Sequence, residues 1–296
     1  MRPGAVLTER DVEVLHGLRR LGALTTEQIG RLGFPSRQTA LRRLRRLEAA
    51  GLIRCSSVPT LPVRLVTLTP RGAESMPGAG EYARQTRRLP RALFLHHFVA
   101  VNDLRLALEE SLRQSDGVEL LDFFTDRERM GHGAGRQPRP LLSFAVSDER
   151  GAIVRHIPDA IFTLRRGDRV ATFLAELDLG TEVVGDGQRG VGKIMRFYLN
   201  ALTREGLGGL ESALPGTMKS QGFRVLFLTV STRRIEGIRR RWGAAAFQPE
   251  AAKRFIWLGT LDALRGRELL RWPWVSLDPE DTASYPILSE KDGQRS

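Results

Sequence analysis

The chain has 296 residues and a formal net charge of +12, with 27% charged and 41% hydrophobic residues. This length allows two domains, and this composition is that of a globular protein rather than of a disordered one. A single cysteine, Cys55, excludes an intrachain disulfide framework and a cysteine-based zinc site. The sequence has neither a signal-peptide pattern nor an apolar run of about 18–20 residues, so we expect a cytoplasmic protein with no membrane partner.

Most of the positive charge lies in the first third of the chain. Residues 1–90 contain 16 arginines, no lysine and seven acidic residues, and so carry +9 of the total charge of +12. A genome rich in G and C raises the arginine content everywhere, but it does not explain this asymmetry. A basic excess in one part of a chain favours a polyanionic partner, here double-stranded DNA.

Three helices are expected first along the chain. The apolar periodicity predicts one helix that ends near Leu21, a short one at residues 27–32 and a third from Ser36 to Gly51. Serine is a favourable N-cap residue, and glycine commonly follows the last turn of a helix.

The third helix has one apolar and one basic face. At about 100° per residue, Leu41, Leu44 and Leu47 share a side, and the arginines are concentrated on the other. A solvated amphipathic helix is the alternative, but this layout is also that of a recognition helix in a DNA groove. The predicted base-reading residues at its N-terminal end are Ser36, Arg37, Gln38 and Thr39. The predicted phosphate contacts are Arg42, Arg43 and Arg46.

Two strands follow, at residues 52–55 and 64–69, joined by a segment that contains proline. Three helices followed by a strand pair are typical of a winged helix-turn-helix domain, which we expect at residues 1–75. Arg54 and Arg64 would assist DNA binding from the wing.

A linker is expected at residues 76–90, a second domain at 91–275 and a C-terminal tail at 276–296. In the second domain the pattern predicts helices at 91–114, 191–202 and 232–246, and strands at 118–125, 141–146, 153–164, 170–179, 224–230 and 254–260. Paired strands followed by alternating elements indicate an α/β fold with a mixed sheet.

Acidic residues interrupt two of these apolar strands. Asp159 lies in the strand at 153–164, and Glu176 and Asp178 lie two residues apart in the strand at 170–179. Residues i and i+2 of a strand point to the same face of a sheet. Buried carboxylates are costly without a cation or another partner, and three of them together suit Mg²⁺ or Mn²⁺.

The acidic cluster has two interpretations. In a metal site, Lys193 on the following helix would neutralise the carboxylates or orient a water molecule. In a structural network, the same carboxylates would pair with Arg155, Arg196 or Lys193.

The spacing Pro158-Asp159, then sixteen residues, then Glu176-Leu177-Asp178 resembles the PD-(D/E)xK signature of restriction-endonuclease-like nucleases. The expected order of helices and strands is similar to the core of that fold. The resemblance implies metal ligation by Asp159, Glu176 and Asp178 and catalysis by these three residues with Lys193. Asp178 stands where the motif has lysine, and Lys193 would be its substitute.

A resemblance over most of the chain is to the replication-relaxation family of plasmid and mobile-element proteins. The segments that carry it are residues 7–11, 96–103, 158–160, 176–182 and 193–198. The resemblance implies a DNA-binding module joined to a nuclease-like domain.

Three functions therefore remain open. The first is a DNA-binding protein of a plasmid or mobile element whose nuclease-like domain serves contact, dimerisation or regulation. The second is a metal-dependent endonuclease directed by the winged helix, and the third is a dimeric transcriptional repressor. We expect a homodimer, because paired half-sites are the usual way in which small DNA-binding domains gain specificity, and other mobile-element proteins are possible partners.

Overall fold

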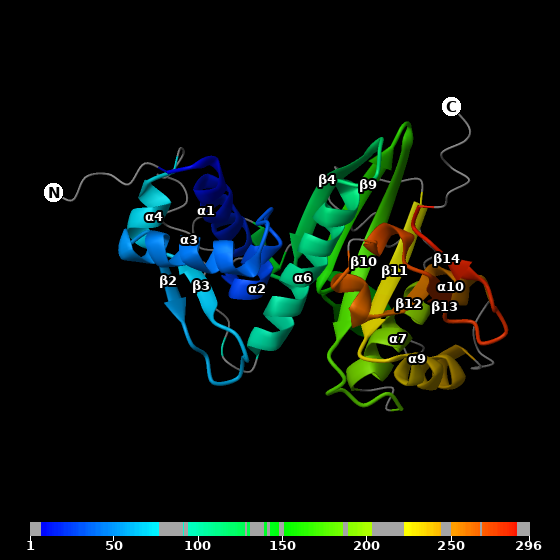
Figure 1. The fold of residues 1–296 in the computed structure, drawn as a ribbon. Coiled ribbons are helices and arrows are strands. Elements are labelled where there is room, and N and C mark those ends of the chain that lie inside the picture. Colours follow the sequence, from blue (N-terminus) through cyan, green and yellow to red (C-terminus); the bar gives the residue numbers. More distant parts are fainter. Residues whose placement is uncertain are drawn as a thin grey trace. The chain divides into compact units, whose positions relative to one another are not determined.

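The structure is a computed structural model. It describes residues 7–76, 91, 94–127, 129–130, 139–140, 143–147, 151–185, 189–202, 222–243, 250–266 and 268–288. The chain divides into two compact units, Met1–Leu106 and Ala107–Ser296 (Figure 1). The division falls inside helix α6 (Leu95–Leu112). The expected linker at 76–90 lies outside the described residues, except for Met76.

The first unit combines helices with a small antiparallel sheet of strand order β1-β3-β2. Its elements are α1 (Glu9–Leu21), β1 (Ala23–Thr25), α2 (Thr26–Gly30), α3 (Arg37–Ala49), β2 (Ile53–Ser56), β3 (Leu65–Leu68) and α4 (Pro70–Glu74), followed by the start of α6. The three predicted helices and two predicted strands are present, within two residues at each end. Strand β1 and helix α4 were not predicted.

The core of the first unit forms where the apolar faces of α1 and α3 meet. Leu15 and Leu18 of α1 and Leu44 and Leu47 of α3 are buried in one cluster. Helix α3 begins where the Ser36 hydroxyl oxygen accepts a hydrogen bond from the Thr39 N–H at 3.2 Å. The leucine face predicted from the sequence is therefore the packed face of α3, which leaves its other face to solvent.

One glutamine joins the start of α2 to α6. The Oε1 atom of Gln28 accepts a hydrogen bond from the Thr25 N–H at 3.0 Å, while the Gln28 N–H donates to the Thr25 hydroxyl at 3.1 Å. The Nε2 atom of Gln28 donates to the Val99 carbonyl at 2.9 Å and to Asp103 Oδ1 at 3.0 Å. The same buried side chain therefore caps one helix and holds another.

A buried ion pair connects α1 with α3. Asp11 is 2% exposed, accepts a hydrogen bond from the Thr8 N–H at 2.8 Å, and receives Nε and Nη2 of Arg43 on its two carboxylate oxygens. Burial opposes the ionisation of Asp11, but the hydrogen bonds from Arg43 and Thr8 outweigh it and lower the pKa of this carboxyl. Arg43 thus fixes the recognition-helix candidate α3 to the start of α1.

The second unit is built on a mixed seven-stranded sheet of order β14-β13-β12-β11-β10-β9-β4. These strands are β4 (Val118–Thr125), β9 (Ala160–Arg166), β10 (Arg169–Asp178), β11 (Gly222–Thr229), β12 (Ile256–Thr260), β13 (Trp274–Ser276) and β14 (Ser284–Tyr285). Strands β10, β11 and β12 are parallel to one another, and the other neighbouring pairs are antiparallel. The predicted α/β class with a mixed sheet is confirmed.

Shorter elements complete this unit. They are the strands β5 (Arg129–Met130), β6 (Arg139–Pro140), β7 (Phe144–Ser147) and β8 (Ile153–His156), the helices α7 (Gly190–Asn200), α9 (Thr232–Ile238) and α10 (Glu250–Phe255), a π-helical turn Arg239–Gly243, and the 3₁₀ turns Leu261–Leu264 and Leu269–Arg271.

Helices α7 and α9 cover the same face of the sheet (Figure 1). Met195 and Tyr198 of α7 and Ile235 of α9 are buried in one cluster with Leu174 of β10 and Phe227 of β11. Leu174, Glu176 and Asp178 alternate along β10, so both acidic side chains point toward the helices.

The helix expected at 232–246 is α-helical only to Ile238 and continues as the π-helical turn Arg239–Gly243. Two further predictions from the sequence differ from the structure. The strand expected at 153–164 is divided into β8 and β9, which belong to different sheets. Pro158 lies in the break, because proline has no N–H to donate to a sheet ladder. The tail expected from residue 276 begins later, since β14 still belongs to the main sheet and Leu277 is buried.

The Asp11–Arg43 pair leads to a stability prediction. Arg43→Ala leaves a buried carboxylate without its counter-charge, so we expect the free energy of unfolding of the first unit to fall by about 1–3 kcal/mol. Hydrogen exchange of the α1 and α3 amides measures this loss. Arg42→Ala, at an exposed position of the same helix, is the control and should cost less than about 0.5 kcal/mol. Equal protection in the two variants would contradict the role given to Arg43.

Candidate functional site

The solvent-facing side of α3 carries most of the residues predicted to contact DNA. Arg42 and Arg46 are exposed, and among the residues that the structure describes neither side chain has an ion-pair or hydrogen-bond partner. Arg37 and Gln38 are exposed at the start of the helix, where Ser36 is engaged as the N-cap. This face is therefore available to a polyanion.

Arg43 differs from the other predicted phosphate contacts. Its guanidinium is held by Asp11, and Nη2 also donates to the Thr8 hydroxyl at 2.6 Å. It therefore acts within the unit and leaves the predicted phosphate contacts to its neighbours. In the hairpin, Arg54 and Arg64 are exposed, and Nη2 of Arg64 donates to the Cys55 carbonyl at 2.7 Å.

In the second unit, Glu176 lies at the centre of a buried polar cluster. Its side chain is 2% exposed, and its Oε1 atom accepts a hydrogen bond from the Tyr198 hydroxyl at 2.5 Å. The Nε2 atom of His156 lies 2.6 Å from the same oxygen. The His156 ring also contacts Phe197 and Tyr198, with centroids 5.1 and 5.5 Å away. Strand β8 and helix α7 thus both supply partners to a carboxylate on β10.

Burial and charge shift the ionisation of this cluster. Burial raises the pKa of Glu176 and raises that of Tyr198 well above its ordinary value. Burial alone would lower the pKa of His156, but the Glu176 carboxylate outweighs it and raises that pKa. The nearby charge of Lys193 acts in the opposite direction on His156. Glu176 and His156 therefore form a coupled pair inside the unit.

Asp159 occupies the point where strands β9 and β10 part. The ladder between them ends at the pair Ala160 and Ala175. Beyond it, the Leu177 N–H donates to Asp159 Oδ2 at 2.7 Å, so the carboxylate continues the hydrogen bonding where the neighbouring strand stops. Asp159 also lies close enough to Glu176 to oppose its ionisation.

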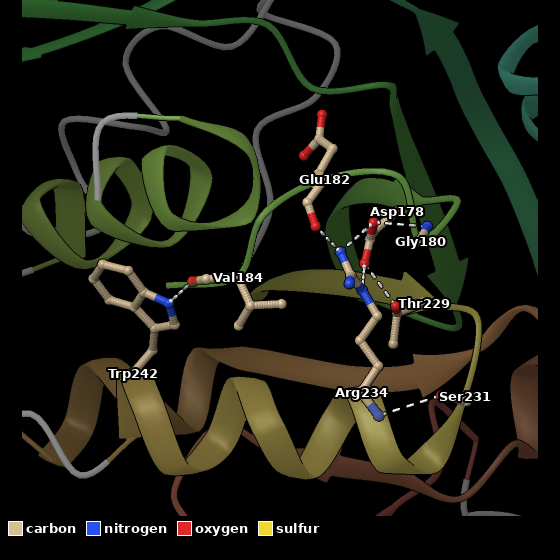
Figure 2. Close-up of polar contacts among 8 residues, drawn as sticks. All are labelled: Asp178, Gly180, Glu182, Val184, Thr229, Ser231, Arg234 and Trp242. Carbon is tan, nitrogen blue, oxygen red and sulfur yellow. Dashed lines mark hydrogen bonds and ion pairs between the residues drawn. The ribbon is translucent and has the colours of Figure 1, made fainter. Parts of the chain in front are cut away.

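Asp178 is buried in a separate network, which Figure 2 shows. Its Oδ1 accepts hydrogen bonds from the Gly180 N–H and from Nη2 of Arg234, both at 3.0 Å. Its Oδ2 accepts from the Thr229 hydroxyl at 2.7 Å and from Nε of Arg234 at 2.5 Å. Both carboxylate oxygens are therefore occupied, and Arg234 supplies the counter-charge.

The same arginine holds the segment that follows β10. Nη2 of Arg234 donates to the Glu182 carbonyl at 2.6 Å, and Nε1 of Trp242 donates to the Val184 carbonyl at 2.9 Å (Figure 2). Gly180 has a φ of 81°, in the left-handed region that suits glycine, where the chain turns away from the sheet. Helix α9 and the turn after it thus fasten residues 180–184.

The three acidic residues do not fit a shared divalent cation. Glu176 and Asp178 lie on β10 as expected and share a face, but Asp159 lies in the break between β8 and β9. Asp178 is committed to Arg234, while Glu176 is committed to His156 and Tyr198. Across the described parts of the chain, no group of three or more His, Cys, Asp and Glu side chains is placed to hold a metal ion. Lys193 is exposed on α7 beside His156.

His156, Tyr198 and Arg234 are not among the site residues predicted from the sequence. His156 could have been found from the sequence, as a polar residue in a predicted strand three positions before Asp159. Nothing in the sequence indicates Arg234 in this way, because it lies on α9, 56 residues after Asp178.

Comparison with known protein families supplies the decisive match. The replication-relaxation family matches residues 15–201. The chain belongs to the replication-relaxation family. The match includes α3, the three acidic residues and Lys193, and it ends one residue after α7, before Arg234. Membership associates the chain with replication of mobile elements.

No curated protein and no solved structure matches the chain. In the described part of the chain, no helix is both long enough and apolar enough to span a bilayer.

The Glu176–His156 pair leads to a prediction about proton binding. In Glu176→Gln the carboxylate that raises the His156 pKa is removed while the burial that lowers it remains, so this pKa should fall. An NMR titration of the histidine rings measures it, with the His156 signal assigned by its loss in His156→Gln. Glu119→Gln, an exposed acid elsewhere in the unit, should leave the His156 pKa unchanged. A constant or increased pKa in Glu176→Gln would refute the pairing.

The Asp178–Arg234 pair leads to a prediction about stability. Arg234→Met leaves a buried carboxylate without its cation, and we expect the second unit to lose about 3 kcal/mol of unfolding free energy. Asp178→Asn combined with Arg234→Met should cost less than the sum of the two single changes. All four tryptophans lie in this unit, so fluorescence during urea unfolding reports on it alone.

Arg233→Met is the matched control, because Arg233 is the exposed neighbour of Arg234. Additive costs in the double variant, or the same loss in Arg233→Met, would show that the buried pair is not coupled.

Proposed function

We propose that this chain is a DNA-binding protein of a mobile element, and that residues of its first unit form a winged helix with α3 as the recognition helix. The order of three helices and an antiparallel hairpin supports this proposal. So does membership in the replication-relaxation family. In such a domain, the recognition helix enters the major groove with its N-terminal residues near the base edges.

The observation that carries the proposal is the division of α3 into two faces. Leu44 and Leu47 are buried and Leu41 is partly buried, while Arg42, Arg45 and Arg46 are exposed on the other side. Like charges four residues apart, as in Arg42 and Arg46, repel one another on a helix surface, and a row of phosphates relieves that repulsion. Arg54 and Arg64 place further positive charge on the hairpin.

Cleavage of DNA is not part of this proposal. A metal-dependent nuclease built on Asp159, Glu176 and Asp178 needs carboxylate oxygens free for the cation. Both oxygens of Asp178 accept hydrogen bonds from protein groups, among them those of a guanidinium. We therefore assign no catalytic role to the second unit in this proposal.

Replacing two arginines of α3 tests the proposal. Arg42→Ala with Arg46→Ala removes two phosphate contacts, so duplex affinity should fall for all sequences. The slope of log K against log salt should become shallower by about two units. Fluorescence anisotropy at several salt concentrations measures both quantities. Arg169→Ala with Arg265→Ala removes the same charge from exposed positions in the second unit and serves as the control. Unchanged affinity and slope in the α3 variant would exclude this helix from the interface.

A further inference from the structure

Helix α7 in the second unit presents one face to the core and a different one to solvent. Val191, Met195 and Tyr198 are fully buried against the sheet. Arg189, at the N-cap, and Lys193 and Arg196, within the helix, are exposed. At about 100° per residue these three basic side chains fall within an arc of about 60°, so they form a single row. The row is called the α7 stripe below.

No described acidic side chain forms an ion pair with the α7 stripe. Within the described residues, none of its three side chains has an ion-pair or hydrogen-bond partner, and the first turn of α7 contains no acidic residue. Two other exposed arginines of this unit are paired, Arg165 with Glu119 and Arg265 with Asp262. Like charges three and four residues apart destabilise a helix, so this row favours an external anion.

The shape of the stripe selects the kind of anion. The seven residue steps from Arg189 to Arg196 span about 10 Å, which is the rise of about three nucleotides along one strand. Three cations in an exposed row suit successive phosphates of a chain better than one small anion, which needs converging donors. A lipid surface is the less suitable partner, because the apolar face that an interfacial helix inserts into lipid is, in α7, buried in the protein core.

The surroundings of the stripe add to this argument. Lys193 lies near enough to His156 for its charge to oppose the protonation of that ring and so to lower its pKa. Arg241 is exposed, and its Nη2 lies 3.5 Å from the carbonyl oxygen of Gly185, on the segment that leads to α7. A chain of phosphates on the stripe would therefore pass next to the Glu176–His156 pair.

We propose that the α7 stripe is a second nucleic-acid binding surface, which holds the phosphate backbone of a strand through Arg189, Lys193 and Arg196. It goes beyond the function proposed for α3, because the residues belong to the other unit and none of them contributes to the first surface. Backbone recognition of this kind is independent of base sequence.

The experiment compares two triple variants of the full chain. The stripe variant is Arg189→Gln, Lys193→Gln and Arg196→Gln. The control variant is Arg165→Gln, Arg169→Gln and Arg265→Gln, which removes the same charge from exposed positions of the same unit. Fluorescence anisotropy with a 30-base-pair duplex and a 30-nucleotide single strand, both of mixed sequence, gives affinity and salt slope. Circular dichroism and tryptophan fluorescence confirm that each variant is folded.

We expect the stripe variant to bind nucleic acid about tenfold or more weakly, with a slope of log K against log salt that is shallower by about two to three units. The loss should be seen with the duplex or with the single strand, whichever of the two the stripe binds. The control should change affinity less than threefold. Both variants are also made in the Arg42→Ala, Arg46→Ala background. A loss of affinity on removing the stripe that persists in the Arg42→Ala, Arg46→Ala background is independent of α3. The proposals for the two surfaces can therefore be rejected separately.

Three results would overturn the proposal. One is an unchanged affinity and slope in the stripe variant, for both nucleic acids and in both backgrounds. Another is an equal loss in the control variant, which would reflect net charge alone. The third is stripe-dependent binding to phosphatidylserine vesicles without stripe-dependent binding to nucleic acid. A second readout is the NMR titration of His156, whose pKa should rise when the single strand or duplex binds to wild type and not to the stripe variant.

Discussion

An ionised carboxylate that is withdrawn from water needs hydrogen bonds and a counter-charge from the protein around it, and this constraint organises both units. Asp11, Glu176 and Asp178 are each at most 4% exposed. The desolvation cost of such a group amounts to several kcal/mol, so removing its partner is far more harmful than removing a surface ion pair. Each of the three is met by side chains from elements distant in the sequence: an arginine of α3, a histidine and a tyrosine, and an arginine of α9.

This constraint divides the basic residues into two classes. Arg43 and Arg234 are turned inward and hold a helix in place, while Arg42, Arg46 and the α7 stripe are exposed and unpaired within the described residues. Arginines of one helix thus have different roles: one that can contact a buried carboxylate stabilises the fold, and the others remain exposed. A count of positive charge along the sequence overstates what remains for a polyanion.

The periodicity of apolar residues is sufficient to predict the features that depend on spacing along a single helix or strand. The leucine face of α3, the shared face of Glu176 and Asp178, and the mixed sheet were all predicted from the sequence. The role of Arg43 was not, because on a helical wheel it adjoins the basic face, and only the packing of α1 against α3 brings Asp11 to it. Arg234 is similar, since its pairing with Asp178 depends on how α9 docks on the sheet. The break between β8 and β9 is not predicted, because Pro158 lies within an otherwise strand-like pattern of residues.

The double engagement of Gln28 has a consequence for sequence divergence. The side-chain oxygen of Gln28 caps α2, and its side-chain nitrogen donates to two acceptors on α6. This position therefore needs both a hydrogen-bond acceptor and a donor. Glutamate keeps the acceptor and loses the donor, and it adds a negative charge beside Asp103. Lysine keeps the donor and loses the acceptor. Substitution at position 28 is therefore tolerated only with a compensating change at position 103 or at the cap, and these positions should covary among relatives.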